Sequence, residues 1–167
     1  MAVGEDEDLL LAVLNSAPVA DGVRAELLGA VDGGVGLEGF GGLGTESELR
    51  ALRRARDALQ RAIRGDSEAL DGLAEALRSA VLRPEVRRDG VRWHLDVPAE
   101  ERLAARSVLA WSRVEESMPG RLRACANSEC NLFLIDRSRP GTAKWCSMAT
   151  CGNRMKARTH ARRARQA

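Results

Sequence analysis

Aromatic and β-branched side chains are scarce in this sequence, which has no tyrosine, two phenylalanines and three tryptophans. These residue types favour strands, whereas the apolar content of 44% comes largely from alanine and leucine, which favour helices. Long apolar runs are also missing, and no stretch approaches the ~20 residues that span a bilayer. The composition therefore predicts a mainly α protein with no membrane partner. Its 167 residues suffice for one modest core and a small appended module.

Catalytic groupings are missing as well. Histidine occurs only as His94 and His160, and the sequence contains no recognisable nucleophile–base pair. Residues 33–44 contain seven glycines but no phosphate-binding lysine, so we interpret them as a flexible loop rather than a nucleotide cradle. Because catalysis requires such a constellation of residues, we expect that the protein is not an enzyme.

Cysteine is absent outside one segment of 27 residues, where two C-x4-C pairs lie fifteen residues apart. The four residues are Cys125, Cys130, Cys146 and Cys151. Two pairs at this separation are typical of a closed four-thiolate zinc site. The alternatives are two disulfides or four unrelated thiols. Residues 5–8 are acidic where a signal peptide would be basic and apolar, so we expect a reducing, cytoplasmic location, in which cysteine clusters more often bind metal.

The cysteine-containing segment reads R-L-R-A-C-x4-C-N-L-F-L-I-D-R-S-R and then W-C-S-M-x2-C-G-N-R-x-K-x-R. This run, from Arg121 to Arg158, resembles the CGNR zinc-finger family, and its signature Cys151-Gly152-Asn153-Arg154 is intact. The resemblance implies a Zn²⁺ cofactor and no enzyme activity, and it suggests DNA as the partner. Members of that family are described as stress-induced transcription regulators.

In that family the finger follows a helical N-terminal domain called ABATE. The resemblance therefore implies an ABATE-like domain over residues 1–118 and the finger over residues 119–167. Family members carry a Leu-Asp-Phe-Val-Asn-Thr-like motif near the N-terminus. Here the stretch is Leu11-Ala-Val-Leu-Asn15-Ser16, which keeps the asparagine and lacks the acid and the aromatic residue.

The spacing of apolar residues predicts the helices of the first domain. They are expected over residues 5–15, 21–31, 46–64, 67–81 and 99–117. Thr45 and Glu48 have the spacing of a capping box, and Gly65 is placed to end the helix that they begin. Four arginines at positions 50, 53, 54 and 56 form either a solvated helix face or an anion site.

Two hairpins are also predicted. Residues 85–96 alternate between apolar and polar side chains around Asp89-Gly90, which suits a two-residue turn. Val91, Trp93 and Leu95 would share one face and cover the helices, with His94 on the surface side. In the finger, residues 132–135 would pair with Lys144-Trp145, with Trp145 packed on Phe133 or Leu134. With Cys151 at the start of a helix running toward Arg165, this topology would be treble-clef-like.

Charge divides sharply along the chain. Residues 119–167 contain eleven lysines and arginines and two acids, whereas residues 1–118 contain fifteen arginines and twenty-two acids. From Gly152 onward there is no acid. Such a division indicates an end that binds polyanions, attached to an acidic body.

The candidate nucleic-acid contacts follow from this division. On the terminal helix they are Arg154, Lys156, Arg158, Arg162, Arg163 and Arg165. Four of these recur at helical spacing and could gather phosphates or present arginine to guanine. Arg137, Arg139 and Lys144 could add phosphate contacts. The alternative is a basic tail that only solubilises the chain.

These observations together predict a zinc-containing protein that binds duplex DNA and regulates transcription. The alternative is a zinc-stabilised module that binds RNA or a protein partner, and a thiol redox switch is a third interpretation. A homodimer is a possible form, because so small a finger would bind DNA weakly alone. The sequence does not identify a small-molecule effector.

Overall fold

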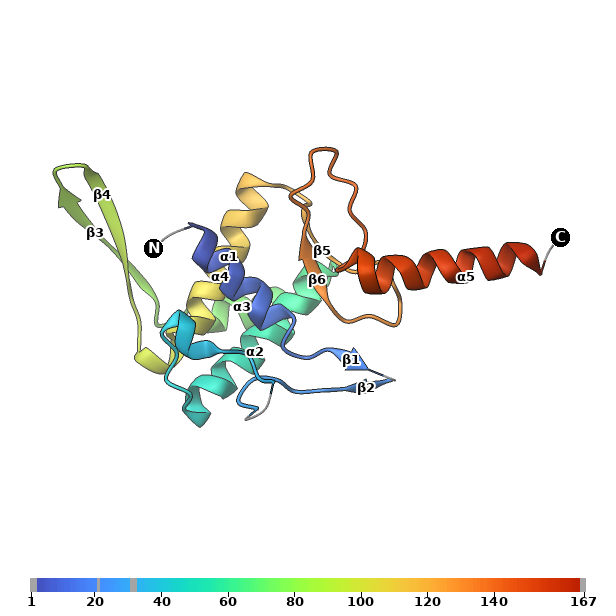
Figure 1. Ribbon diagram of the computed structural model, residues 1–167. Coiled ribbons are helices and arrows are strands. Elements are labelled where there is room, and N and C mark those ends of the chain that lie inside the picture. The colour runs from blue at the N-terminus through green and yellow to red at the C-terminus, as the bar shows by residue number, and fades with distance from the viewer. Residues whose placement is uncertain (1–2, 21, 31–32, 166–167) are drawn as a thin grey trace.

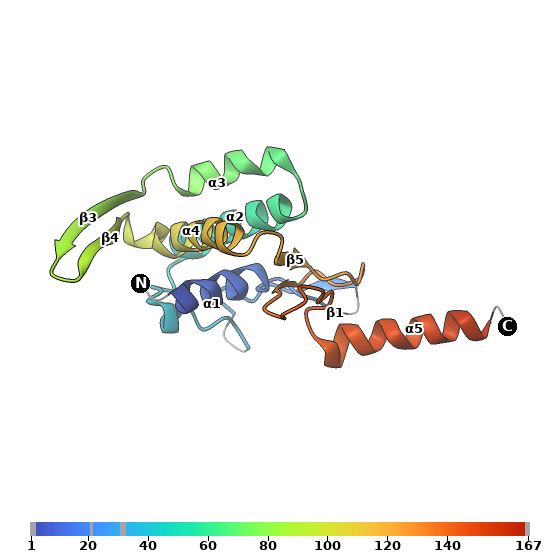
Figure 2. The same cartoon turned by 90° about the horizontal axis from the view of Figure 1, so that it is seen from above.

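The computed structural model describes residues 3–20, 22–30 and 33–165, and about half of the chain is helical. Four helices form the body, and a fifth projects away from it (Figure 1). The helices are α1 (Val3–Leu14), α2 (Glu46–Ile63), α3 (Leu70–Ala76), α4 (Arg102–Ser117) and α5 (Asn153–Ala164). Viewed from above, α2 and α4 lie between α1 on one side and α3 on the other (Figure 2). Every helix of the described part is too short or too polar to cross a bilayer.

The core forms where the leucine stripes of α1, α2 and α4 meet, because each helix is apolar along one face only. Leu9 and Leu10 of α1 and Leu52 and Leu59 of α2 are fully buried in this core. The predictions of helices over residues 5–15, 46–64 and 99–117 are therefore confirmed within a few residues. The last of these begins with a 3-10 turn, Ala99–Glu101.

The start of α2 follows the predicted cap with one difference. The Thr45 side chain accepts a hydrogen bond from the Glu48 amide at 3.3 Å, as a capping box requires. The buried Glu48 carboxylate, however, accepts from the amides of Leu43 and Gly44, each at 2.8 Å. It thereby fixes the end of the glycine-rich loop against the helix. Gly65, with φ of 91°, ends the helix as expected.

The helix expected over residues 21–31 is wrong in the described part of this segment; residues 21 and 31 lie outside it. A short hairpin, β1 (Val19–Ala20) with β2 (Val23–Arg24), takes its place. Gly22 and Gly29 adopt positive φ values of 77° and 82°, which interrupt a helix, and Val23 is 70% exposed. The apolar residues here do not form one buried face, so their helical spacing was misleading.

The helix expected over residues 67–81 is shorter than predicted. A 3-10 turn, Ser67–Ala69, capped by the Asp66 side chain, leads into α3, which ends at Ala76. Val81 instead begins strand β3 (Val81–Arg87), because its backbone pairs with Asp96 of strand β4 (Gly90–Asp96). Val81 matched the helical period by spacing alone.

The β3–β4 hairpin is present but differs from prediction in two respects. Its turn residues are Arg88 and Asp89, while Gly90, at φ 127°, already pairs with Arg87. Its apolar face does not cover the helices, since Val91 and Trp93 remain 54% and 59% exposed. The helices bury their apolar stripes against one another, and the hairpin extends beyond them (Figure 1). His94 is exposed, as expected.

The finger contains a different hairpin from the one predicted. Strand β6 (Phe133–Ile135) pairs antiparallel with β5 (Leu122–Ala124), and Lys144-Trp145 forms no strand. The Lys144 carbonyl instead accepts a hydrogen bond from the Ala126 amide at 2.8 Å. The reason is that residues 136–143 fold back on the Asp136 side chain, which directs the following chain past the first cysteine pair. The treble-clef assignment stays a prediction.

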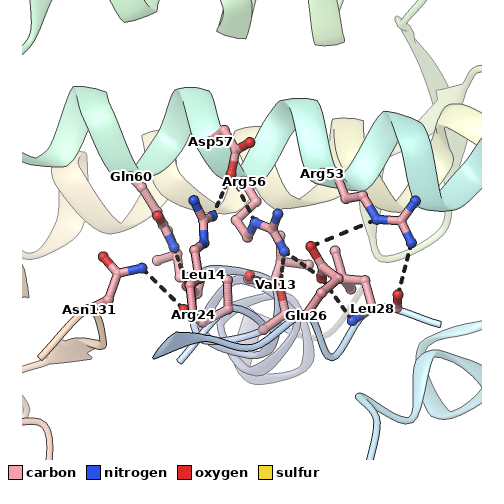
Figure 3. Close-up of polar contacts among 12 residues, drawn as sticks. Val13, Leu14, Arg24, Glu26, Leu28, Arg53, Arg56, Asp57, Gln60 and Asn131 are labelled. Carbon is pink, nitrogen blue, oxygen red and sulfur yellow. Dashed lines mark hydrogen bonds and ion pairs between the residues drawn. The ribbon is translucent and has the colours of Figure 1, made fainter. Parts of the chain in front are cut away.

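The arginine run of α2 includes one buried member, which the sequence did not single out. Arg56 is 3% exposed and donates to Glu26 at 2.7 Å, Asp57 at 3.0 Å and the Ser16 hydroxyl at 3.1 Å (Figure 3). It is neither part of a solvated face nor a vacant anion site. It joins α2 to the chain after α1, because a buried guanidinium requires several acceptors.

Candidate metal centre

The four cysteine sulfurs meet in one cluster, all within 4.8 Å of one another. The Cys146 sulfur is 3.7 Å from that of Cys130 and 3.6 Å from that of Cys151. A tetrahedron with Zn–S bonds of about 2.3 Å has S···S edges of about 3.8 Å. The cluster therefore fits a zinc ion held by four thiolates. The separations are far longer than the ~2.05 Å of a disulfide, and all four cysteines are free.

Each half of the cluster is built by a short local structure. Strand β5 leads into Cys125, and a tight turn closed by the Cys130 amide on the Asn127 carbonyl at 2.8 Å returns the chain to β6. Cys151 lies in a π-helical turn, Met148–Gly152, whose start is capped by the Ser147 hydroxyl. This turn leads directly into α5, so the last sulfur sits at the base of the basic helix.

Three of the four sulfurs also receive N–H groups. The Leu132 amide points at Cys130 and the Cys146 amide at Cys125, each at an N···S distance of 3.5 Å. The Asn127 side-chain amide lies 3.6 Å from the Cys151 sulfur. Donors of this kind spread the negative charge that four thiolates bring to one divalent cation.

Asn127 is a residue of the site that sequence reasoning missed. It is 1% exposed. Its side-chain oxygen accepts from the Glu129 backbone amide at 3.3 Å, while its side-chain NH₂ group faces Cys151. It thereby joins the first knuckle to the last ligand. Its position between the first two cysteines, where an asparagine favours a turn, was the available signal.

The glycine of the CGNR signature lies where an added side chain would meet two neighbours. A Cβ on Gly152 would lie 2.7 Å from the Met148 sulfur and 3.2 Å from Cδ1 of Trp145. Trp145 thus covers the π-helical turn and lies outside the apolar cluster that contains Phe133. The Asn153 side chain donates to the Ala149 carbonyl at 3.3 Å, which is a structural role in the same turn.

The electrostatics of the thiols differ around the cluster. Burial raises the pKa of Cys130 and, more strongly, that of Cys146. Burial also acts to raise the pKa of Cys151, but hydrogen bonds from Asn127 and the other cysteines outweigh it and lower that pKa. A metal ion must displace any protons that remain on these thiols, so its binding is linked to proton release.

Asp136 organises the loop between the two halves of the finger. It is 2% exposed and accepts from the Ser138 hydroxyl at 2.6 Å and from the Ser138 and Ala143 amides, each at 2.9 Å. The hydrogen bonds from Ser138 hold the pKa of this carboxyl below its usual range. The Asp136 carboxylate therefore stabilises the loop over residues 136–143 by accepting these hydrogen bonds.

The finger is fastened to the helical body by two asparagines. Asn15 accepts from the Phe133 amide at 2.7 Å and donates to the Phe133 carbonyl at 3.2 Å. Asn131 donates to the Ala17 carbonyl at 3.1 Å (Figure 3) and accepts from Arg64 at 2.6 Å. Arg64 also stacks over the Phe133 ring, 4.4 Å from its centroid.

The predicted nucleic-acid residues divide into two groups. All six basic residues of the terminal segment are exposed, and no residue of α5 is buried. Arg158, Arg162 and Arg165 share one side of the helix, where with Ala161 they line a shallow hollow of about 420 Å³. Of these six basic residues, only Arg158 forms an ion pair with an acid in the described part of the chain, at 2.6 Å from Glu129. That pairing raises the pKa of Arg158 and lowers that of Glu129.

The other candidates lie on the loop after β6. Arg137 is engaged by Glu7 of α1 at 2.5 Å, so it contacts the helical body. Arg139 and Lys144 are exposed and have no ion-pair partner among the described residues. The structure thus presents one continuous basic element, α5, with the loop residues apart from it.

A four-cysteine cluster of this geometry, with two cysteines buried and two half-buried and an exposed helix after it, has the ligand set of a zinc finger. Residues 121–164 match the CGNR zinc finger family, a range that covers all four cysteines and all of α5. No curated protein matches the chain.

Proposed function

We propose that the protein is a zinc-containing regulator that binds duplex DNA through α5. The single observation that carries this proposal is the helix itself, which has twelve residues, none buried, and no acidic side chain. A helix with this composition gains nothing from packing, whereas it is suited to phosphates in a groove. The match to a zinc finger supports the same view.

In this proposal the metal is structural. Four thiolates would hold Zn²⁺ and leave no open coordination position, so the ion would supply a rigid base for α5 and no chemistry. Only Gly152 separates the last ligand, Cys151, from Asn153, the first residue of α5. The cluster would therefore fix the direction in which the helix leaves the finger. We also propose that the protein is not an enzyme.

The ion pair between Glu129 and Arg158 ties α5 to the first knuckle. Both groups are about half exposed, at 56% and 47%, so the pair is weak and a phosphate can compete for the arginine. Arg162 has no acidic partner among the described residues and is the cleaner probe of a DNA contact. Neutralising Glu129 would release Arg158 and remove a negative charge beside the proposed surface.

The test is a titration of the zinc-loaded chain with a duplex selected from random sequence and with a scrambled duplex, at two salt concentrations. Arg162→Ala should weaken binding, and a phosphate contact would lower the salt slope by about one unit. A guanine contact would instead cost ~1–3 kcal/mol on the selected duplex alone. Glu129→Gln should strengthen binding.

The matched control is Arg50→Ala, which removes an exposed arginine from α2. It should leave DNA affinity unchanged. If the Arg158→Ala, Arg162→Ala double variant binds DNA as the parent does, α5 is not the DNA-binding element. Transcription regulation, the link to stress and the ABATE assignment rest on the resemblance alone.

A further inference from the structure

The β3–β4 hairpin carries an exposed apolar face that the proposed function leaves unused. The register pairs Leu82 with Leu95, Pro84 with Trp93 and Val86 with Val91, so all six side chains lie on one face. Val86 is 83% exposed and Trp93 59%. A two-stranded hairpin is marginal in water unless its apolar face packs against something. The hairpin therefore lacks a covering element within the described chain.

Leu82, Trp93 and Leu95 of this face line one wall of a groove of about 850 Å³, and α4 forms the other. The apolar lining consists of Leu82, Trp93, Leu95 and Leu109. The charged lining residues are Arg87, Arg92, Arg102, Arg106, Arg113 and Glu116, and His94 also lines the groove. The volume is within the ~300–1,000 Å³ range of ligand sites, and exposed tryptophan and arginine are the residues that most often dominate docking energies.

Charge indicates what kind of occupant fits. Four of the lining arginines pair with acids, but none of those acids lines the groove itself. Arg102 is exposed and has no ion-pair partner among the described residues. Arg106 is buried against Asp6, so Arg102 is the lining guanidinium that is exposed and not engaged by an acid of the described chain. Glu116 is the one acidic lining residue within that part of the chain. A second copy of the hairpin, with four arginines against three acids, would bring more positive charge.

We propose that this groove docks a short acidic segment of a partner protein, in which carboxylates alternate with large apolar side chains. The apolar groups would cover Trp93 and its neighbours, and a carboxylate would meet Arg102. Further carboxylates would compete for Arg87 and Arg92, whose ion pairs are about half exposed. The hairpin and α5 lie at opposite ends of the molecule (Figures 1 and 2). Docking would therefore leave α5 free.

The experiment selects binders from a displayed library of random 12-residue peptides on the zinc-loaded full chain. The basic α5 will also attract acidic peptides, so the library is first depleted on a Trp93→Ala, Arg102→Glu variant, which keeps α5 intact. Both substitutions are at exposed positions, and thermal melting checks that the variant stays folded. The enriched peptides should combine acidic with large apolar residues.

A synthetic copy of an enriched peptide is then titrated by fluorescence anisotropy. Trp93→Ala and Arg102→Glu should each lower the affinity for the peptide by about tenfold or more. The matched controls, Leu70→Ala on α3 and Arg50→Glu on α2, should leave it unchanged. The proposal is overturned if no peptides are enriched, if the enriched peptides lack acids, or if the controls weaken binding equally. It is also overturned if sedimentation shows a dimer that Trp93→Ala dissociates, because a second copy would then cover the face.

Discussion

At the scale of single residues, the surroundings of Gly152 disfavour a larger residue directly after Cys151. Its φ of −61° is open to any residue, so the constraint is the space occupied by Met148 and Trp145. Gly152→Ala should destabilise the finger by about 1 kcal/mol, the low end of the cost of overpacking, because the exposed end of Met148 can move aside and Trp145 must shift only slightly. The measurement is thermal unfolding with zinc bound.

Gly39→Ala is the control, since a Cβ there meets nothing within 4 Å. It should leave the melting temperature nearly unchanged. An unaltered melting temperature for Gly152→Ala would show that the close contacts relax at little cost.

Asn127 supports a metal ligand without being one. Asn127→Ala removes the N–H group that faces the Cys151 sulfur and the acceptor for the Glu129 amide. Loss of such a supporting contact typically costs about 10–100-fold in metal affinity, and we expect a loss of that size. Competition with a chromophoric zinc chelator measures it.

Asn153→Ala provides the comparison, because its exposed side chain donates only to the Ala149 carbonyl. A zinc affinity equal to that of the parent for Asn127→Ala would refute the supporting role.

At the scale of elements, the side chain of Asn15, directly after α1, bridges α1 to β6. Asn15 satisfies both the amide and the carbonyl of Phe133. Asn15→Ala would leave these backbone groups without partners at a largely buried position, which costs about 1–3 kcal/mol. Hydrogen exchange at the Phe133 amide should accelerate in step with the lost stability.

Asn15→Asp separates the two halves of this contact, since a carboxylate can still accept from the amide but cannot donate to the carbonyl. It should fall between the parent and Asn15→Ala in stability. Unchanged exchange in both variants would show that α1 and β6 are held together by packing alone.

At the scale of the whole molecule, the finger and the helical body share one core. Leu122 of β5 and Phe133 of β6 belong to the same buried cluster as the leucines of α1, α2 and α4. Structural zinc supplies roughly 10 kcal/mol or more in small fingers. Cys146→Ser should therefore unfold the finger and also lower the stability of the helices, because two core residues lose their positions.

Amide protection in α1 and α2, measured with and without the substitution, tests this coupling. Protection that is unchanged in both helices would show that the body folds independently of the finger. Adding a chelator to the parent protein should reproduce the effect of the substitution.

The clustering of the four cysteines and the strongly amphipathic helices could be predicted from the amino-acid sequence. Cysteine count and spacing are local properties of the chain, and a closed tetrahedral site requires four ligands whatever the surrounding fold. The leucine stripes of α1, α2 and α4 likewise bury the side that their period predicts. The exposure of helix α5 could also be predicted, because its sequence is rich in arginine and has no apolar stripe that would need to be buried.

Features that depend on partners distant in the chain emerged only from the folded molecule. Strand pairing in the finger followed the fold of the loop around Asp136, so β6 met β5 instead of residues 144–145. Asn15 and Phe133 are 118 residues apart, and no local pattern predicts a hydrogen bond across that separation. Arg56 became buried because acceptors from the segment after α1 reach it. The hairpin face stayed exposed because the helices had already buried their own stripes, which is a property of the assembled core and of no single segment.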